Sequence, residues 1–118
     1  MKNIVKEKSF AFSVSIVKTC QKLQSEQKEY VLSKQLLRSG TAIGALIREA
    51  EYAESKKDFV HKFGIAQKEA NETLYWLELL QATDYISITT FDILHQAATE
   101  LLKLITSIIK TTKAHINN

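Results

Sequence analysis

The chain has 118 residues, which is enough for one domain and too few for two. Apolar residues make up 45% of it, which excludes intrinsic disorder, and the lack of proline together with only three glycines excludes a fold of short strands and turns. A single cysteine excludes an intrachain disulfide and a cysteine-based zinc cluster. With no membrane-length apolar stretch and no signal-peptide core, the sequence predicts a soluble, cytoplasmic protein.

The charge is unevenly distributed along the chain. The net charge is +3, but residues 1–38 carry +5, residues 39–100 carry −5 and residues 101–118 carry +3. Basic ends of this kind are typical of a surface that binds a polyanion such as nucleic acid. They are also typical of a solvated face that neighbouring acidic residues neutralise, and the sequence leaves both interpretations open.

The first predicted helix covers about residues 6–27. Its apolar edge consists of Phe12, Ile16, Cys20 and Leu23, which recur at helical spacing. Further apolar residues, at positions 10, 14 and 17, lie beside this edge.

The second predicted helix covers about residues 30–54. Its core stripe steps alternately by four and three residues, through Leu32, Leu36, Ser39, Ile43, Leu46, Ala50 and Ala53. A small-residue face with Gly40 and Gly44 lies beside this stripe and would let another helix approach closely. That second helix could belong to the same chain or to another subunit.

Two further helices are predicted at about residues 56–82 and 89–114, from stripes that begin at Phe59 and Phe91. Ser55 and Thr89 match the capping-box pattern at their starts. Because the joints are only a few residues long, consecutive helices must run antiparallel. The sequence therefore predicts a single all-α domain over residues 1–118, an antiparallel up-down-up-down four-helix bundle.

Motifs for catalysis or metal binding are missing from the sequence. The pairs Asp58/His61 and Asp92/His95 have the spacing of carboxylate–histidine ligands, but antiparallel helices would place them at opposite ends of the bundle. Cys20 has no histidine near it in sequence, and no glycine-rich phosphate loop occurs. We therefore expect no catalytic residues, no metal and no cofactor.

Apolar residues in excess of the core predict contact with another chain. They recur on the sides of the third and fourth helices, away from the core stripes. Together with the glycines, they give a set of candidates for a subunit interface: Gly40, Gly44, Trp76, Leu102 and Ile109.

Several segments, taken in their order along the chain, resemble the bacterial family of four-helix bundle proteins encoded in intervening sequences of 23S ribosomal RNA genes. They are LSKQLLRSGTAIGA (32–45), REA (48–50), SKKDF (55–59), AQKEANE (66–72) and YWLE (75–78). The resemblance spans essentially the whole chain and implies a homopentamer. It also implies a distant likeness to the pentameric accessory protein of diversity-generating retroelements, which binds nucleic acid and a reverse transcriptase. The family pattern usually has serine where Ala42 stands and asparagine where Leu46 stands.

The basic positions that match the family pattern are the candidates for contact with RNA or DNA: Lys34, Arg38, Arg48, Lys56, Lys57 and Lys68. The first functional hypothesis is a non-enzymatic, pentameric accessory protein that binds nucleic acid through such residues. The alternative is an assembly scaffold that binds a protein partner through apolar surface near Trp76 or Ile109.

Overall fold

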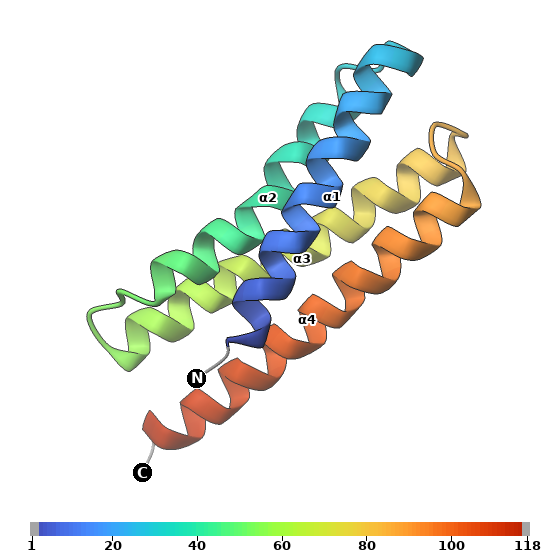
Figure 1. Ribbon diagram of the computed structural model, residues 1–118. Helices are drawn as coiled ribbons and strands as arrows, with labels where there is room; N and C mark the ends of the chain where they lie inside the picture. The colour runs from blue at the N-terminus through green and yellow to red at the C-terminus, as the bar shows by residue number, and fades with distance from the viewer. Residues whose placement is uncertain (1–2, 117–118) are drawn as a thin grey trace.

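The computed structural model describes residues 3–116, which form four α-helices and no strand. The helices are α1 (Ile4–Gln27), α2 (Leu32–Ala50), α3 (Lys56–Ala82) and α4 (Ile88–Ile116). They run alternately up and down in an elongated bundle of 51 × 24 × 21 Å (Figure 1). The predicted all-α, antiparallel four-helix bundle is confirmed.

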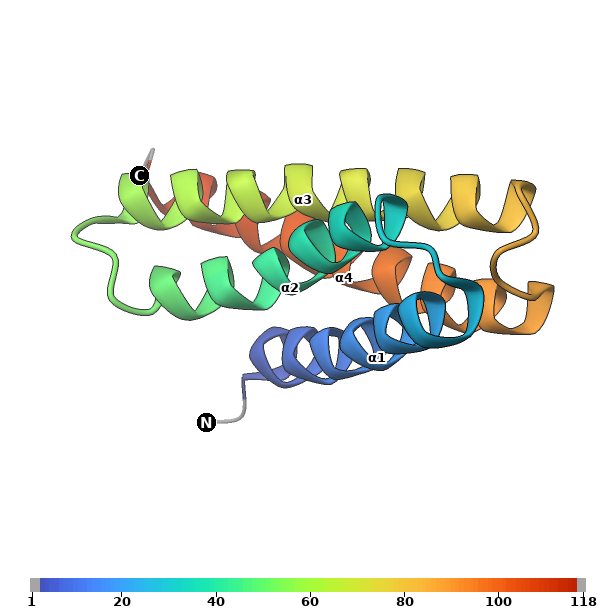
Figure 2. The ribbon, with the colours of Figure 1, turned by 90° about the horizontal axis from the view of Figure 1, so that it is seen from above.

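Each helix packs on the one that follows it in the chain, and α1 closes the bundle against α4. The contact of α1 with α4 is the least extensive of the four, so α1 is held chiefly by α2 (Figure 2). The start of α1 and the end of α4 lie toward the end of the bundle that carries the α2–α3 joint (Figure 1). Across residues 3–116, none of the helices combines the length and apolar character needed to cross a lipid bilayer.

Short polar side chains cap the starts of three helices. Asn3 accepts a hydrogen bond from the amide of Lys6 and begins α1 two residues earlier than predicted. Ser55 accepts from the amide of Asp58, as the predicted capping box requires. The predicted cap at Thr89 is wrong: Ser87 takes this role by accepting from the amide of Thr90, so α4 begins at Ile88.

The second helix is shorter than predicted at both ends. At its start, Lys28 adopts a left-handed conformation that ends α1, and the Glu29 carboxylate accepts hydrogen bonds from the amides of Val31 and Ser33. These bonds replace the first helical turn, so α2 begins at Leu32. After Ala50 the backbone tightens into bonds between residues three apart, and Ser55 then starts α3.

The core follows the predicted stripes closely. All predicted residues of α1 are buried, and on α3 and α4 the stripes are buried apart from half-buried positions near the helix ends. On α2 the stripe is less complete: Leu32 and Leu46 are half-buried, Ala53 lies beyond the end of the helix, and Ile47, which is outside the predicted stripe, is fully buried. Ile47 follows Ile43 by four residues and Gly40 by seven, so it lies on the side of α2 that carries Gly40, and Gly40 packs on Ile16 of α1.

Gly40 allows α1 to approach α2 closely. A Cβ atom built at this position would lie 2.9 Å from Cγ1 of Ile16, which is fully buried. At Gly44 the nearest neighbours would be Ser13 Oγ and the backbone of Ser9, at 3.4 Å. The small-residue face of α2 therefore makes a contact within the chain, one of the two alternatives that the sequence left open.

Alanine substitutions should distinguish Gly40, where close helix packing requires glycine, from Gly64, where it does not. We expect Gly40→Ala to lower the free energy of unfolding by about 1–3 kcal/mol, because the buried, β-branched Ile16 cannot move aside without strain. Gly64→Ala is the matched control: no atom lies within 4 Å of its Cβ position, and we expect it to stabilise α3 by about 0.5–1 kcal/mol. Denaturant unfolding measures both, and equal effects of the two would contradict the assignment.

Candidate nucleic-acid interface

The six predicted nucleic-acid contacts do not form one patch. Lys34 lies in the first turn of α2, whereas Arg48, Lys56 and Lys57 lie around the α2–α3 joint at the other end of the bundle. Lys68 is in the middle of α3. These five side chains are exposed, and within residues 3–116 none of the five forms an ion pair.

Arg38 differs from the other five because carboxylates already bind it. Its guanidinium lies 3.3 Å from Glu72 Oε2 and 3.9 Å from Glu69 Oε2, so it links α2 to α3. The indole N–H of Trp76 donates to the same Glu72 oxygen at 3.0 Å. This group, Arg38, Glu69, Glu72 and Trp76, is called the arginine cluster below.

The arginine cluster carries more negative than positive charge. Two carboxylates face one guanidinium, and Glu69 Oε1 is buried without a hydrogen-bond partner among the residues that the structure describes. A phosphate approaching Arg38 would meet both carboxylates. The arrangement therefore favours a structural role for Arg38 between α2 and α3 over a primary contact with a polyanion.

Unpaired lysines also occur outside the predicted set. Lys103 and Lys110 are exposed on α4 and form no ion pair within residues 3–116. The signal for them was present in the sequence, since residues 101–118 contain three lysines and no carboxylate. The segments that carry the family resemblance end at residue 78, before these two lysines.

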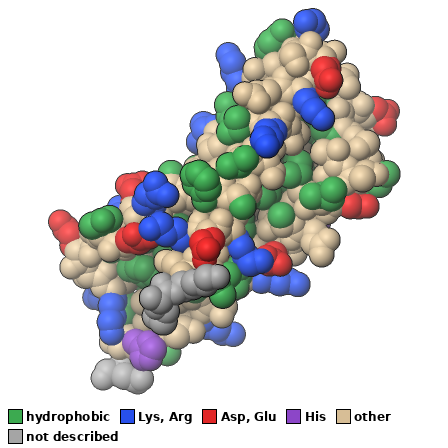
Figure 3. Space-filling view, viewed as in Figure 1, with side chains coloured by type: hydrophobic (Ala, Val, Ile, Leu, Met, Phe, Trp, Pro, Cys, Tyr) green, Lys and Arg blue, Asp and Glu red, His purple; other side chains and the backbone are tan. Residues whose placement is uncertain are grey.

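Apolar surface is concentrated between α1 and α2, away from most of the predicted interface residues. Phe10 is 60% exposed and Tyr52 84%, and they border a groove of about 580 Å³ whose floor includes Gly44. Val14 and Val17 extend this surface along α1. In Figure 3 apolar side chains reach the surface along the middle of this face, between lysine and arginine side chains. We call this surface the α1–α2 groove.

The residues predicted for a subunit interface lie mostly against their own chain. Gly40 is buried, and Gly44, which is half-buried, packs against α1 from one side of the α1–α2 groove. Trp76, Leu102 and Ile109 are half-buried and pack against the core. Their role in contact with another subunit stays a prediction.

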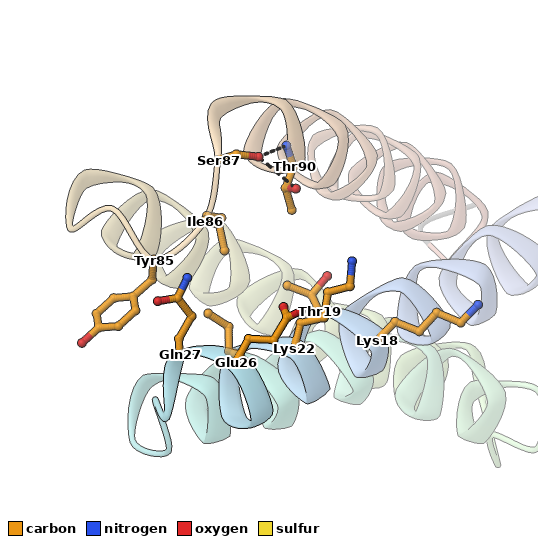
Figure 4. A pocket seen from close by; sticks show the side chains of 10 residues that line it. Lys18, Thr19, Lys22, Glu26, Gln27, Tyr85, Ile86, Ser87 and Thr90 are labelled. Carbon is orange, nitrogen blue, oxygen red and sulfur yellow. Dashed lines mark hydrogen bonds between the residues drawn. The ribbon is translucent and has the colours of Figure 1, made fainter.

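A second hollow, of about 320 Å³, lies between the end of α1 and the start of α4. Figure 4 shows Ser87 and Thr90 at the start of α4 facing Thr19 and Lys22 on α1. Glu26 also lines this hollow, so its charge is mixed. That mixture offers no clear preference for an anion or a cation.

The environment of Cys20 is that of a buried structural thiol. The thiol donates to the carbonyl oxygen of Ser33 at 3.3 Å, and burial raises its pKa to about 11. Of the two predicted histidine pairs, Asp58 binds Lys62 and His95 lies 3.5 Å from Glu78. Within residues 3–116, no three His, Cys, Asp or Glu side chains come together in a way that could hold a metal ion.

The order of the helices and the features of their surface define an all-α bundle protein. It has an exposed apolar groove and several basic side chains that form no ion pair among residues 3–116. A family model described as 23S rRNA-intervening sequence protein matches residues 1–107, and the chain belongs to this family. The fold is similar to the crystal structure of a protein of unknown function, of the S23 ribosomal protein family, from Bacteroides thetaiotaomicron. That match has a TM-score of 0.89 and 57% identity, and it covers 90% of this chain and 98% of that one. No curated protein matches the chain.

The buried thiol gives a direct test of how firmly α1 is held against α2. With a pKa of about 11, about one Cys20 thiol in a thousand is ionised at pH 8, and burial blocks access to it. We expect a thiol reagent such as DTNB to react with the folded protein at least about 100-fold more slowly than with protein unfolded in guanidinium. Comparable rates in the two states would mean that α1 detaches readily.

Proposed function

We propose that the protein is a non-enzymatic, homopentameric protein of the cytoplasm that binds RNA or DNA. The observation that carries the proposal is that most of its exposed basic side chains have no carboxylate partner in residues 3–116. Such side chains can exchange their counterions with those of a polyphosphate, which is the main source of affinity in nonspecific nucleic-acid binding.

The assembly strengthens this proposal because it repeats a weak contact. One chain has a net charge of only +3, but five copies carry +15. When one subunit of a ring is bound, the others are held near the same polymer, so individually weak contacts act together. The description of the matching family, which refers to 23S rRNA, makes RNA the polymer to test first.

A second candidate function is a scaffold that binds a protein partner. The α1–α2 groove favours it, since exposed aromatic and branched side chains there offer apolar area to another protein. This differs from the surface around Trp76 and Ile109 that the sequence suggested, because both of those side chains are half-buried. Under this alternative the protein would have negligible affinity for nucleic acid.

Fluorescence anisotropy of labelled nucleic acids at several salt concentrations tests the first proposal. We expect structured RNA, single-stranded DNA or duplex DNA to bind with a log–log salt slope of several units, since each phosphate contact contributes about 0.7–0.9. The absence of binding to all three polymers at low salt would contradict the proposal and direct the search to protein partners.

The assembly is tested separately by light scattering after size exclusion. We expect a particle of about 67 kDa, five times the 13.4 kDa of one chain. If the α1–α2 groove contributes to the subunit contact, Phe10→Ser should produce smaller particles without loss of helicity, because this side chain is 60% exposed in the single chain. A monomeric wild type at micromolar concentration would contradict the pentamer.

A further inference from the structure

In the second half of α4, positively charged side chains outnumber negatively charged ones. From Leu101 to Ile116 the helix contains Lys103, Lys110 and Lys113 and no carboxylate. The closest acidic residue along the helix is Glu100, and Lys8 of α1 binds it. Neither Lys103 nor Lys110 has a carboxylate within 4.0 Å in the part of the chain that the structure describes.

Two of these lysines share one side of α4 with a hydroxyl group between them. Lys103, Ser107 and Lys110 follow one another at spacings of four and three residues, so their side chains form a single row. These three residues also line one shallow hollow, together with Leu102 and Thr106. We call the row of Lys103, Ser107 and Lys110 the α4 basic row.

The hydroxyls in this hollow differ in how they are used. Thr106 donates to the carbonyl of Leu102 and accepts from the Gln67 amide at 2.9 Å, so it is held by its own chain. The side chain of Ser107 is exposed and makes no hydrogen bond within residues 3–116. Its O–H is therefore available to donate to an external acceptor.

Support of the helix itself does not explain the α4 basic row. Cations near a helix C-terminus interact favourably with the macrodipole, but this effect falls off within the last turn. α4 ends at Ile116, so Lys113 lies in the last turn, whereas Lys103 is thirteen residues, or about 20 Å, from the end. Lys110 has no acidic residue three or four positions away, and Glu100, three positions before Lys103, forms its ion pair with Lys8 and not with Lys103.

We infer that the α4 basic row binds the phosphodiester backbone of a nucleic acid. The two lysines are about 10.5 Å apart along the helix axis, and a duplex carries one phosphate per strand for every 3.4 Å or so of its own axis, so both lysines can contact phosphates of one backbone. Each ammonium would contact a phosphate as a point charge, and the Ser107 hydroxyl would donate to a phosphate oxygen between them. The inference rests on the proposed function and narrows it to one face of one helix.

The composition of this face favours a polymer backbone over bases or a membrane. The row contains no arginine, asparagine or aromatic side chain of the kind that reads or stacks on bases, so binding should depend little on sequence. Of the exposed large apolar side chains among residues 3–116, none lies in the second half of α4. The face therefore lacks the apolar anchors with which surface helices enter a lipid bilayer.

The decisive experiment compares two double variants that remove the same charge. Lys103→Gln/Lys110→Gln removes the lysines of the row, and Lys18→Gln/Lys22→Gln removes two exposed lysines of α1 that are likewise unpaired within residues 3–116. Anisotropy with an RNA hairpin and with duplex DNA, over a range of salt, measures affinity and salt slope. Circular dichroism verifies that both variants keep the helicity of the wild type.

For the α4 variant we expect affinity to fall at least about tenfold and the salt slope to decrease by about 1.4–1.8, which corresponds to two lost phosphate contacts. The α1 variant should change affinity less than about twofold. Ser107→Ala should weaken binding with the slope unchanged, because a neutral donor releases no counterion. A loss of affinity for RNA alone, for DNA alone or for both supports binding by the α4 basic row and shows which polymers it binds.

Two outcomes overturn the inference, and they can be told apart from failure of the proposed function. Equal losses in the α4 and α1 variants would mean that net charge alone governs binding. Unchanged affinity of the α4 variant, with the wild type binding well, would place the contact elsewhere and leave the proposed function intact. If the wild type binds neither polymer at low salt, the inference fails, and the proposed function fails with it if single-stranded DNA does not bind either.

Discussion

The close contact between α1 and α2 at Gly40 determines much of the remaining structure. Because α2 has no side chain at this position, Ile16 can lie fully buried against its backbone. A helix that is held tightly by one neighbour need not bury a wide stripe against the other, and α1 does contact α4 less extensively. The same orientation leaves Phe10 and its neighbours along α1 in solvent, which creates the α1–α2 groove. Packing inside the chain thus sets the apolar surface that it offers to other molecules.

A second constraint is the division of the basic residues into those that form ion pairs within the fold and those that form none among residues 3–116. Lys8 and Arg38 each join two helices through a carboxylate, and Lys6 joins α1 to Glu51 in the α2–α3 joint, so these charges are compensated within the bundle. Exposed ion pairs of this kind contribute little stability each, but they lower the local potential that a polyanion would meet. The positive surface available to a partner is therefore smaller than the count of basic residues suggests, and the second half of α4, with three lysines and no carboxylate, is one part of it.

The sequence predicted the fold well because long stripes of apolar residues at helical spacing leave few alternatives. The prediction from sequence was wrong where a single hydrogen bond determines at which of several neighbouring residues a helix begins. Hydrogen bonds to the Glu29 carboxylate take the place of the first predicted turn of α2, and Ser87 caps α4 instead of Thr89. The spacing of the apolar residues predicts neither of these helix starts. Leu46 and Ile47 are neighbours on one helix, and which of them is fully buried depends on the side of α2 that faces the other helices, which is a tertiary property.

The candidate site was harder to predict because whether a basic side chain can bind a polyanion depends on carboxylates that are distant in sequence. Arg38 matched the family pattern, yet its guanidinium binds Glu72, 34 residues away. Lys103 was not selected, yet Glu100, its closest acidic neighbour along the chain, is bound by Lys8, 92 residues away from that glutamate. A basic residue contributes to polyanion binding only when the fold leaves its charge uncompensated. For helical bundles of this kind, the pairing of each lysine and arginine across the helices is therefore a better guide to the binding surface than the number of basic residues in any one segment.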